Sequence, residues 1–328
     1  MMRPIEHTRW QLVNRIDFSV IIVTYNSERC IKKCIDSVQS ALADCEYGYE
    51  IIVVDNNSQD ATVEIVKGLP KIKLIENKKN VGFSTANNQA VERARGEILF
   101  FLNPDARVLS PEVFRAVHKV FNDNAHVGCV GVRMVDESGE TVLSGFSFEA
   151  WWMAVVRLLT MDIVNLRIIR DKKYIKRTST RDLPISVDWV SGGAMFIPRN
   201  VYKGVGGYDN SFFLYSEDVD LCKRIKEKGF QVLFLPYIAV YHEGSHSSRR
   251  FEKKIYFRNK SYVLYACKHY ARWQCALFKS ALFINLLEKF AFTAVLGQLF
   301  FGKRDSIIRM RNYLNAMKSV INNDWKIG

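Results

Sequence analysis

The sequence predicts an α/β fold built on a mainly parallel sheet. Through roughly the first hundred residues, short apolar runs rich in β-branched side chains alternate with helical segments of about a dozen residues. Strands that are joined through helices form right-handed βαβ units, so neighbouring strands lie parallel. Polar clusters directly follow three of these runs, at the strand ends where such sheets bind ligands. These observations predict a ligand-binding crevice along one edge of the sheet.

The first half of the chain contains four such strands. FSVIIV is typical of the group, because it is short, apolar and bounded by polar residues. The expected strands are 18–23, 50–55, 72–77 and 97–102. The expected helices are 28–42, 61–68, 84–95 and 111–123.

The second half alternates less regularly. VGCVGVRMV (127–135) indicates another strand, and residues 149–183 are expected to hold a helix and a loop with the basic run RDKKYIKR. Residues 185–199 predict a strand interrupted by Gly192 and Gly193, because paired glycines in an apolar run mark a bulge or the close approach of a ligand. A helix that begins in the acidic cluster near residue 217 and ends at Gly229, and strands at 231–236 and 239–247, complete this part.

Cysteine content and length bound the class of protein. The 328 residues suffice for one large domain with extensions or for two domains. Seven cysteines without repeating pairs disfavour a disulfide framework and favour a reducing compartment. Cys30 and Cys34 are expected to be buried thiols, since no second pair at ligand spacing accompanies them. Residues 1–17 are expected to be an N-terminal extension and contain no apolar signal segment.

The positive charge is concentrated near the C-terminus. The net charge is +13, and residues 246–328 hold 16 Lys and Arg against 4 Asp and Glu. A basic region on a nearly neutral body indicates an anionic partner, either phospholipid or nucleic acid. We therefore expect residues 248–328 to form a basic helical region outside the main domain.

Residues 277–301 are apolar but contain polar interruptions. These are Lys279, Asn285, Glu288, Lys289 and Gln298. The interruptions disfavour a membrane-spanning helix, and their distribution disfavours a cleanly amphipathic one. A tertiary or dimer helix would fit the pattern, but the flanking runs RRFEKK and GKRDSIIRMR favour attachment to an anionic leaflet.

Acids and amides at the strand ends suit the binding of a nucleoside diphosphate. The Asn-Pro-Asp turn at Asn103 is ordinary by itself, but acids after two neighbouring strands favour a functional role. Asp105 with His242 would suit Mg²⁺ or Mn²⁺ on a diphosphate, although His242 could equally be a hydrogen-bonded residue of the rim. Asp55 could accept the N3–H of uracil or thymine.

A second acidic cluster suits proton transfer. Glu217, Asp218 and Asp220 crowd the first turn of a predicted helix, where acids interact favourably with the helix dipole. Like charges this close raise one another's pKa, which makes Asp218 a candidate general base. No phosphate-binding loop and no G-x-G-x-x-G motif follow the first strand. This absence disfavours dinucleotide oxidoreductases and nucleotidyltransferases.

With these residues in place, the chain resembles the family 2 inverting glycosyltransferases of the GT-A fold. It is most similar to the rhamnosyltransferase-like group of bacterial surface-polysaccharide synthesis. The resemblance covers about residues 18–247 and includes, in order, SVIIVTYNS, EIIVVDNNSQD, NVGFSTANN, FLNPDA, WVSGGAMFIPR, GGYDNSFFLYSEDVDLCKRIKEKGF and the stretch after His242. It implies a Rossmann-like mixed, mainly parallel sheet flanked by helices.

The resemblance also implies a role for each matching position. The nucleotide and donor residues would be Thr24, Tyr25, Asn26, Asp55, Asn80, Gly82, Phe83, Asn87 and Asn103. The sugar and acceptor pocket would include Trp189, Gly192 and Gly193, the metal ligands would be Asp105 and His242, and the catalytic pair would be Glu217 with the base Asp218. Asn103 replaces the first acid of the family's D-x-D motif, which implies weaker binding of free metal.

The implied activity is metal-dependent transfer of a hexose with inversion. The expected donor is dTDP-rhamnose, with a UDP-hexose as the alternative, and the expected acceptor is a saccharide, carried on a lipid, at the inner face of the bacterial cell membrane. A homo-oligomer is left open. A nucleic-acid-binding protein that uses the basic region is the competing class, but this region contains no nucleic-acid-reading module. An inactive relative would have no use for the Glu217–Asp218 pair.

Overall fold

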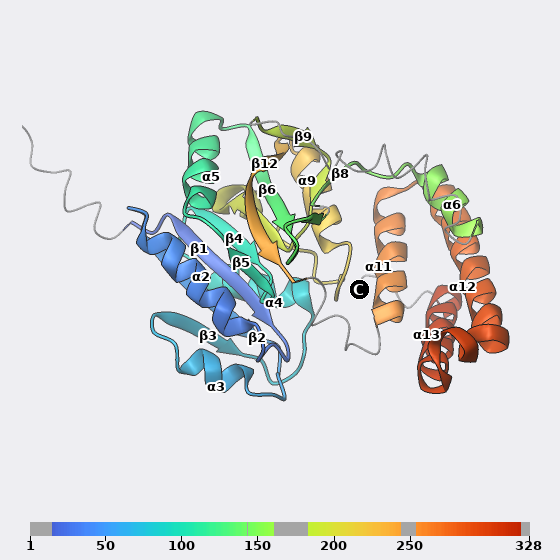
Figure 1. Ribbon diagram of the computed structural model, residues 1–328. Helices are drawn as coiled ribbons and strands as arrows, with labels where there is room; N and C mark the ends of the chain where they lie inside the picture. Colours follow the sequence, from blue (N-terminus) through green and yellow to red (C-terminus); the bar gives the residue numbers. More distant parts are fainter. Residues whose placement is uncertain (1–14, 143, 161–182, 244–253, 323–328) are drawn as a thin grey trace, which may run out of the picture.

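The computed structural model describes residues 15–142, 144–160, 183–243 and 254–322 (Figure 1). Within these residues, helices flank a mixed, mainly parallel sheet, and further helices follow at the C-terminal side, as the sequence predicts. The strand order of the main sheet is β3-β2-β1-β4-β11-β6-β12-β5, with β7 beside β6 and β9 beside β12.

The parallel half of the sheet is close to the prediction. Its strands are β1 (Phe18–Thr24), β2 (Tyr49–Asp55), β3 (Ile72–Glu76) and β4 (Ile98–Leu102). The connecting helices are α2 (Ile31–Ala43), α3 (Thr62–Lys67) and α4 (Phe83–Arg93). β1 pairs in parallel with both β2 and β4, and all its residues are buried. Burial on both faces explains why its sequence is apolar without alternation.

The other half of the sheet mixes directions. β11 (Ala194–Pro198) runs antiparallel to β4 and to β6 (Val127–Val135), whereas β12 (Gln231–His242) runs parallel to β6. The two strands predicted at 231–236 and 239–247 are one strand, β12, whose pairing with β6 shifts between Leu235 and Ala239. A local irregularity, and not a turn, interrupts the apolar pattern there.

Several short elements differ from the prediction. The strand expected at 185–199 is three strands with different partners: β9 (Ile185–Val187) pairs with β12, β10 (Trp189–Val190) pairs with β8 (Gly145–Phe146), and β11 joins the main sheet. Further short elements are β5 (Ala106–Val108), β7 (Thr141–Val142) and α8 (Arg199–Gly204). Elements of two to six residues are too short for a hydrophobic period to predict them.

Two hydrophobic cores lie on opposite faces of the sheet. One packs α2, α3 and α5 (Glu112–Asp123) against it. The other packs α4, α8 and α9 (Glu217–Glu227) against it. The sheet therefore has helices on both faces (Figure 1) and ends in polar loops along one edge.

A third core belongs to the C-terminal helices. These are α11 (Lys254–His269), α12 (Arg272–Phe301) and α13 (Lys303–Asn322), and α6 (Trp151–Leu159) packs with them (Figure 1). The predicted helical C-terminal region is confirmed, and residues 277–301 lie within the single helix α12. The domain boundary expected at 247 and the basic run at 170–177 lie outside the described residues.

The cysteines follow the prediction in one respect only. Cys30 and Cys34 are buried free thiols, as expected. Cys267 at the end of α11 and Cys275 in α12 form a disulfide, which the odd cysteine count did not predict. The cross-link joins the two helices across the short turn that separates them.

Candidate active site

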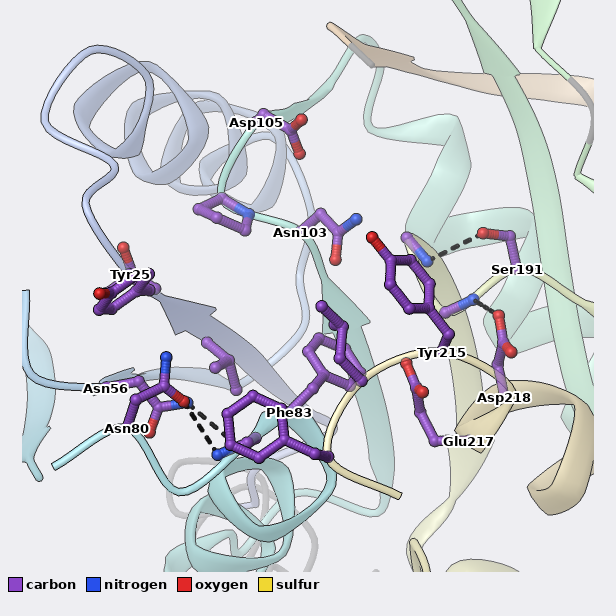
Figure 2. A pocket seen from close by; sticks show the side chains of 18 of the residues that line it. Tyr25, Asn56, Asn80, Phe83, Asn103, Asp105, Ser191, Tyr215, Glu217 and Asp218 are labelled. Atoms are coloured by element: carbon purple, nitrogen blue, oxygen red, sulfur yellow. Dashed lines mark hydrogen bonds between the residues drawn. The ribbon is translucent and has the colours of Figure 1, made fainter. Parts of the chain in front are cut away.

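Twelve of the predicted site residues line one cavity of about 320 Å³ (Figure 2). They are Thr24, Tyr25, Asn80, Gly82, Phe83, Asn103, Asp105, Gly192, Gly193, Glu217, Asp218 and His242. Tyr25, Asn80 and Phe83 lie on one side of the cavity, and Glu217 and Asp218 lie on the other. The strand ends of the parallel half and the start of α9 thus open into the same space.

The wall near Asn80 depends on a glycine. Gly82 has φ +87°, its N–H donates to Asn80 Oδ1 at 3.0 Å, and its carbonyl accepts from Asn56 Nδ2 at 3.2 Å. A Cβ on Gly82 would lie 2.8 Å from the carbonyl oxygen of Phe213. Both the backbone angle and the close approach therefore require glycine. Asn56, which lines the cavity and follows β2 directly, was not among the predicted site residues.

Three predicted donor residues hold the loops and do not line this cavity. The carboxylate of Asp55 accepts hydrogen bonds from the backbone N–H and the hydroxyl of Ser58. Asn26, at φ +52°, accepts from the backbone N–H of Gln59 at 2.7 Å. Asn87 is buried in α4 and donates to the carbonyl of Phe83 at 2.9 Å. Asn26 and Asn87 lie in segments that also carry Tyr25 and Phe83, which line the cavity.

A short strand brings Asp105 and His242 together. β5 pairs with the end of β12, so that Ala106 lies opposite His242. His242 Nε2 lies 3.5 Å from Asp105 Oδ1 and 3.2 Å from Asn103 Nδ2. The Asn-Pro-Asp turn is closed by a bond from the Ala106 N–H to the Asn103 carbonyl at 3.0 Å. The Asn-Pro-Asp sequence therefore forms a hydrogen-bonded turn, as predicted. The turn also directs Asp105 toward His242, which lies 137 positions later in the chain.

The Asp105–His242 pair fits a divalent cation that shares its ligands with a diphosphate. The described residues contain no group of three or more acidic, histidine or cysteine side chains that could hold a metal by itself. One carboxylate and one imidazole are enough when phosphate and water oxygens complete the shell, and imidazole suits Mn²⁺ better than Mg²⁺. The buried atoms Thr24 Oγ1 and His242 Nδ1 have no hydrogen-bond partner within the described part of the chain.

The paired glycines support the opposite wall. The carbonyl of Gly193 accepts the Asn103 N–H at 3.0 Å, and a Cβ on Gly193 would lie 3.1 Å from Met134 Sδ and 3.5 Å from His242 Nε2. The N–H of Gly192 donates to Asp218 Oδ2 at 3.0 Å. The glycine pair thus lies between the predicted metal ligands and the predicted base.

Glu217 and Asp218 begin α9 after a strained turn. Tyr215 and Ser216 both have positive φ, 74° and 63°, which is uncommon for residues with side chains and often accompanies functional sites. Asp218 accepts from the N–H groups of Gly192 and Val219. Burial raises the pKa of Asp218, although these backbone donors oppose the shift. Burial, and then the charge of Asp218, raise the pKa of Glu217 well above its usual value.

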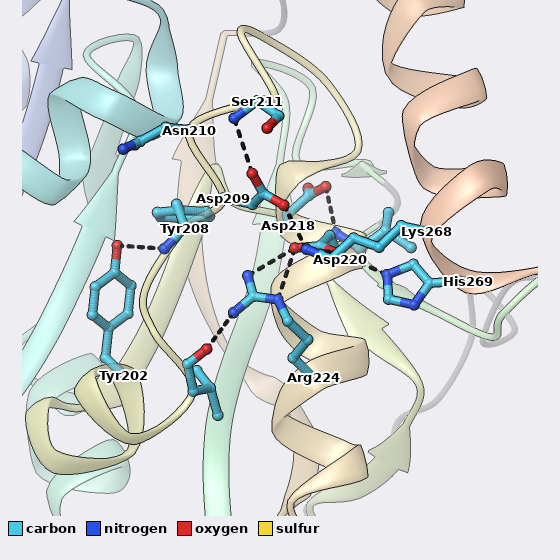
Figure 3. Close-up of polar contacts among 12 residues, drawn as sticks. Tyr202, Tyr208, Asp209, Asn210, Ser211, Asp218, Asp220, Arg224, Lys268 and His269 are labelled. Atoms are coloured by element: carbon cyan, nitrogen blue, oxygen red, sulfur yellow. Dashed lines mark hydrogen bonds and ion pairs between the residues drawn. The ribbon is translucent and has the colours of Figure 1, made fainter. Parts of the chain in front are cut away.

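The third acid of this turn has a different environment (Figure 3). Asp220 is fully buried and contacts Arg224 Nε at 2.9 Å, Lys268 Nζ at 2.9 Å and His269 Nε2 at 2.8 Å. Burial alone would raise the pKa of Asp220, but these hydrogen bonds and charges lower it to about 2. Since Lys268 and His269 belong to α11, this network fastens the C-terminal helices to the start of α9.

Trp189 lines a neighbouring cavity of about 440 Å³. Its ring stacks on Phe146 with centroids 4.0 Å apart. Tyr215, Glu217 and Asp218 line both cavities, so the paired carboxylates are shared between them. The residues from α11 and α12 that line the second cavity were not predicted as site residues, because nothing in their local sequence points to a site.

Known proteins resemble this chain along most of its length. The N-acetylglucosaminyl-diphospho-decaprenol L-rhamnosyltransferase of Mycobacterium tuberculosis is 23% identical over 79% of the chain and 87% of its own length. Rhamnosyltransferase WbbL of Escherichia coli is 26% identical over 72% of the chain and 87% of its own length. The chain spans only 26% of another relative, the uncharacterized protein y4gI of Sinorhizobium fredii, at 25% identity over 73% of the chain.

Solved structures share the GT-A fold. GalNAc-T7, crystallised with UDP, GalNAc and Mn²⁺, has a TM-score of 0.56 at 17% identity over 95% of this chain and 58% of its own. The mannosyltransferase PcManGT of Pyrobaculum calidifontis, in complex with GDP-Man and Mn²⁺, has a TM-score of 0.53 at 16% identity over 95% and 89%. These likenesses concern the fold alone and confirm the predicted fold class.

Two family models match the sequence. The N-terminal domain of galactosyltransferase matches residues 174–247. The model of glycosyl transferase family 2 matches residues 19–200, more than half of the chain. This match includes the strand ends, the Asn103–Asp105 turn and the glycine pair that line the cavity. The chain belongs to glycosyl transferase family 2.

Proposed function

We propose that this chain is an inverting hexosyltransferase that uses a nucleoside-diphosphate sugar, with dTDP-rhamnose as the donor, and a lipid-linked saccharide as the acceptor. One observation carries the proposal: a carboxylate pair with raised pKa values, the buried Glu217 and the half-buried Asp218, lines the same cavity as the Asp105–His242 pair. The names of the two rhamnosyltransferase relatives support rhamnose. A UDP-hexose remains the alternative donor, since UDP was crystallised with a neighbour of the same fold.

In this proposal, the donor occupies the side of the cavity lined by Thr24, Tyr25, Asn80 and Phe83. Asp55 remains the proposed acceptor for the N3–H of the base. Its register partner Thr24 lines the cavity, and a carboxylate that accepts two hydrogen bonds from Ser58 keeps further capacity. Asn26 and Asn87 act by holding the loops around the donor.

Asp105 and His242 would hold a Mg²⁺ or Mn²⁺ ion, and Asn103 would lie beside it. When bound, this cation would neutralise negative charge on the diphosphate leaving group. Asn103 Nδ2 donates toward His242 Nε2 at 3.2 Å, so the orientation of the Asn103 amide affects the orientation of the His242 ring. The asparagine contributes no charge, and the diphosphate oxygens would supply the missing ligands.

The proposed reaction is a single displacement. Asp218 accepts the proton of the acceptor hydroxyl as the hydroxyl oxygen forms a bond to the anomeric carbon of the donor. The bond from that carbon to the diphosphate oxygen breaks on the opposite face, and the leaving diphosphate takes the electron pair. Configuration at the anomeric carbon therefore inverts without a covalent enzyme intermediate. Burial of Asp218 raises its pKa, which makes its carboxylate a stronger base.

We also propose that the C-terminal helices attach to an anionic membrane surface. Residues 272–297 of α12 are long and apolar enough to cross a bilayer by length and composition, which is weak evidence by itself, and a third of the most apolar window is buried in the protein. Val295 and Leu299 of this helix are 78% and 81% exposed. Lys303 and Arg304 follow directly, where basic side chains favour anionic lipids.

The decisive test is a donor screen. Thermal shift and donor hydrolysis are measured with dTDP-rhamnose, UDP-hexoses and GDP-mannose, each with and without Mn²⁺ or Mg²⁺. Metal-dependent stabilisation by dTDP-rhamnose alone is the expected result. A preference for a UDP-hexose would reject the sugar while keeping the enzyme class, and no response to any nucleotide sugar would reject the assignment of the cavity. Co-flotation with anionic but not neutral liposomes tests the membrane proposal separately.

A further inference from the structure

The second cavity lies next to the proposed base. It measures about 440 Å³ and shares Tyr215, Glu217 and Asp218 with the cavity proposed for the donor. We propose that it binds the acceptor as a glycosyl phosphate: a sugar ring held by aromatic side chains, with its phosphate group bound by Arg258. This inference rests on the proposed function, and it assigns the acceptor class to a particular part of the fold.

The walls of this cavity suit a sugar ring. They combine side chains from the sheet loops with side chains from α11 and α12. The aromatic members are Phe146, Trp189, Tyr215, Tyr262, Tyr265, Tyr270 and Phe278. Binding sites for small molecules are lined mainly by aromatic and apolar groups with a few polar groups that fix orientation. The flat apolar faces of these rings match the C–H faces of a sugar, and Asp218 supplies the polar group at the reacting hydroxyl.

The two arginines of this cavity differ in their charge balance. Arg157 forms a bidentate ion pair with Glu149, with Nε–Oε1 at 3.0 Å and a second bond at 3.1 Å, so its charge is matched. Arg258 has no ion pair with any residue that the structure describes, and its buried Nε has no hydrogen-bond acceptor there. Guanidinium groups bind phosphate through paired N–H donors. An anionic ligand would therefore supply the hydrogen-bond acceptor and the opposite charge that the described residues do not offer to Arg258.

Helix α11 directs Arg258 into the cavity. Arg258, Tyr262 and Tyr265 are spaced by four and three residues, so they share one helix face, and all three line the cavity. The helix is fastened beside the catalytic turn, because the Ser261 hydroxyl donates to the Leu214 carbonyl at 2.8 Å and His269 contacts Asp220. A phosphate at Arg258 and a hydroxyl at Asp218 would then orient the acceptor in one direction.

The helices around the cavity also suit an acceptor with an apolar tail. In α6, Ala154 and Arg157 line the cavity, whereas Trp152 is 55% exposed. In α12, Phe278 lines the cavity, whereas the adjacent Leu277 is 49% exposed. The same two helices thus combine a ligand-facing side with apolar residues at the surface. This arrangement favours a lipid-linked glycosyl diphosphate over a soluble sugar phosphate.

The test compares three acceptors that differ in one feature each. The probes are N-acetylglucosaminyl diphosphate on a short polyprenyl chain, N-acetylglucosamine 1-diphosphate without the lipid, and methyl N-acetylglucosaminide without phosphate. We expect Arg258→Gln to raise KM for both phosphate-bearing acceptors by about 10- to 100-fold, because a hydrogen-bonded charge is lost. KM for the methyl glycoside and for the donor should stay within about twofold. Arg258→Lys, which keeps the charge, should recover part of the loss. Arg311→Gln, at an exposed position of α13, is the matched control.

The remaining outcomes separate the two proposals. A higher KM for the soluble diphosphate than for the lipid-linked diphosphate in the wild type would identify the lipid as part of the ligand. If Trp189→Ala fails to raise KM for all three acceptors, the aromatic walls do not bind the sugar. Donor hydrolysis without transfer to any probe overturns the acceptor class. If the wild type transfers and Arg258→Gln behaves as the wild type with every acceptor, only this inference fails, whereas absence of any response to a nucleotide sugar rejects the proposed function.

Discussion

Replacing Asp218 by Asn tests the assignment of the base most directly. The carboxylate accepts one N–H from Gly192 at 3.0 Å and one from Val219 at 2.8 Å. An amide offers a single oxygen, so one of these bonds is lost, at a cost of about 1 kcal/mol in the free energy of unfolding. The variant should therefore fold. General base catalysis contributes about 10²- to 10⁴-fold, or roughly 3–5 kcal/mol of barrier, so kcat should fall by that factor.

The assay measures release of the nucleoside diphosphate in the presence of acceptor, with the donor Kd determined by calorimetry. Because the carboxylate is the active form, the wild-type rate should rise with pH through the raised pKa of the Glu217–Asp218 pair, which titrates as a unit. Asp218→Asn should lose this rise while the donor Kd stays within about twofold. Asp36→Asn on the exposed face of α2 is the matched control. Turnover within about tenfold of the wild type would refute the assignment.

Three further predictions concern the site and the network at Asp220 that supports it. Gly82→Ala should raise the donor Kd more than about tenfold, because the new Cβ would lie 2.8 Å from the Phe213 carbonyl oxygen. Gly139→Ala is the control: Gly139 has a similar φ of +77°, but a Cβ there would meet no atom within 4 Å, so the donor Kd should stay unchanged. Asp105→Asn should raise the Mn²⁺ concentration for half-maximal rate by at least about tenfold, and an unchanged metal titration would remove Asp105 from the metal site. The pKa of Asp220 is lowered to about 2 from a usual 3.8, so the ionised carboxylate stabilises the fold above about pH 4. This stabilisation is lost as the pH falls toward 2 and the carboxylate is protonated. The wild type should therefore lose about 2 kcal/mol more than Asp220→Asn in acid denaturation over that range, and parallel curves would contradict the network.

The sequence predicted the parallel half of the fold well because its signals are local. Each of β1 to β4 is a buried run that ends in polar residues, and the helices between them have the expected length. The order of the later strands depends on pairings between distant segments. β11 inserts between β4 and β6 in the antiparallel sense, and no property of the run at Ala194 distinguishes that position from a parallel neighbour.

The donor side of the site follows the same logic. Residues at strand ends converge because the strands are parallel, so Tyr25 and Asn103 were predictable. Asn56 was missed although it adjoins Asp55, because the residue that faces the cavity at a strand end depends on the turn that follows. The approach of Asp105 to His242 depends on β5, a strand too short to predict.

The acids at the start of α9 show why the rest of the site requires the structure. Glu217, Asp218 and Asp220 share one helical turn, and the local sequence does not indicate that their pKa values differ. Their pKa values move in opposite directions, because Asp220 contacts His269 and Lys268 on α11 whereas the first two acids line the cavities. Burying Asp220 without these hydrogen-bond partners would cost several kcal/mol, so the catalytic turn depends on the C-terminal helices for its stability. Since the same helices provide the aromatic wall and Arg258 of the second cavity, loss of the α11 contact should weaken acceptor binding and the fold of the catalytic turn together.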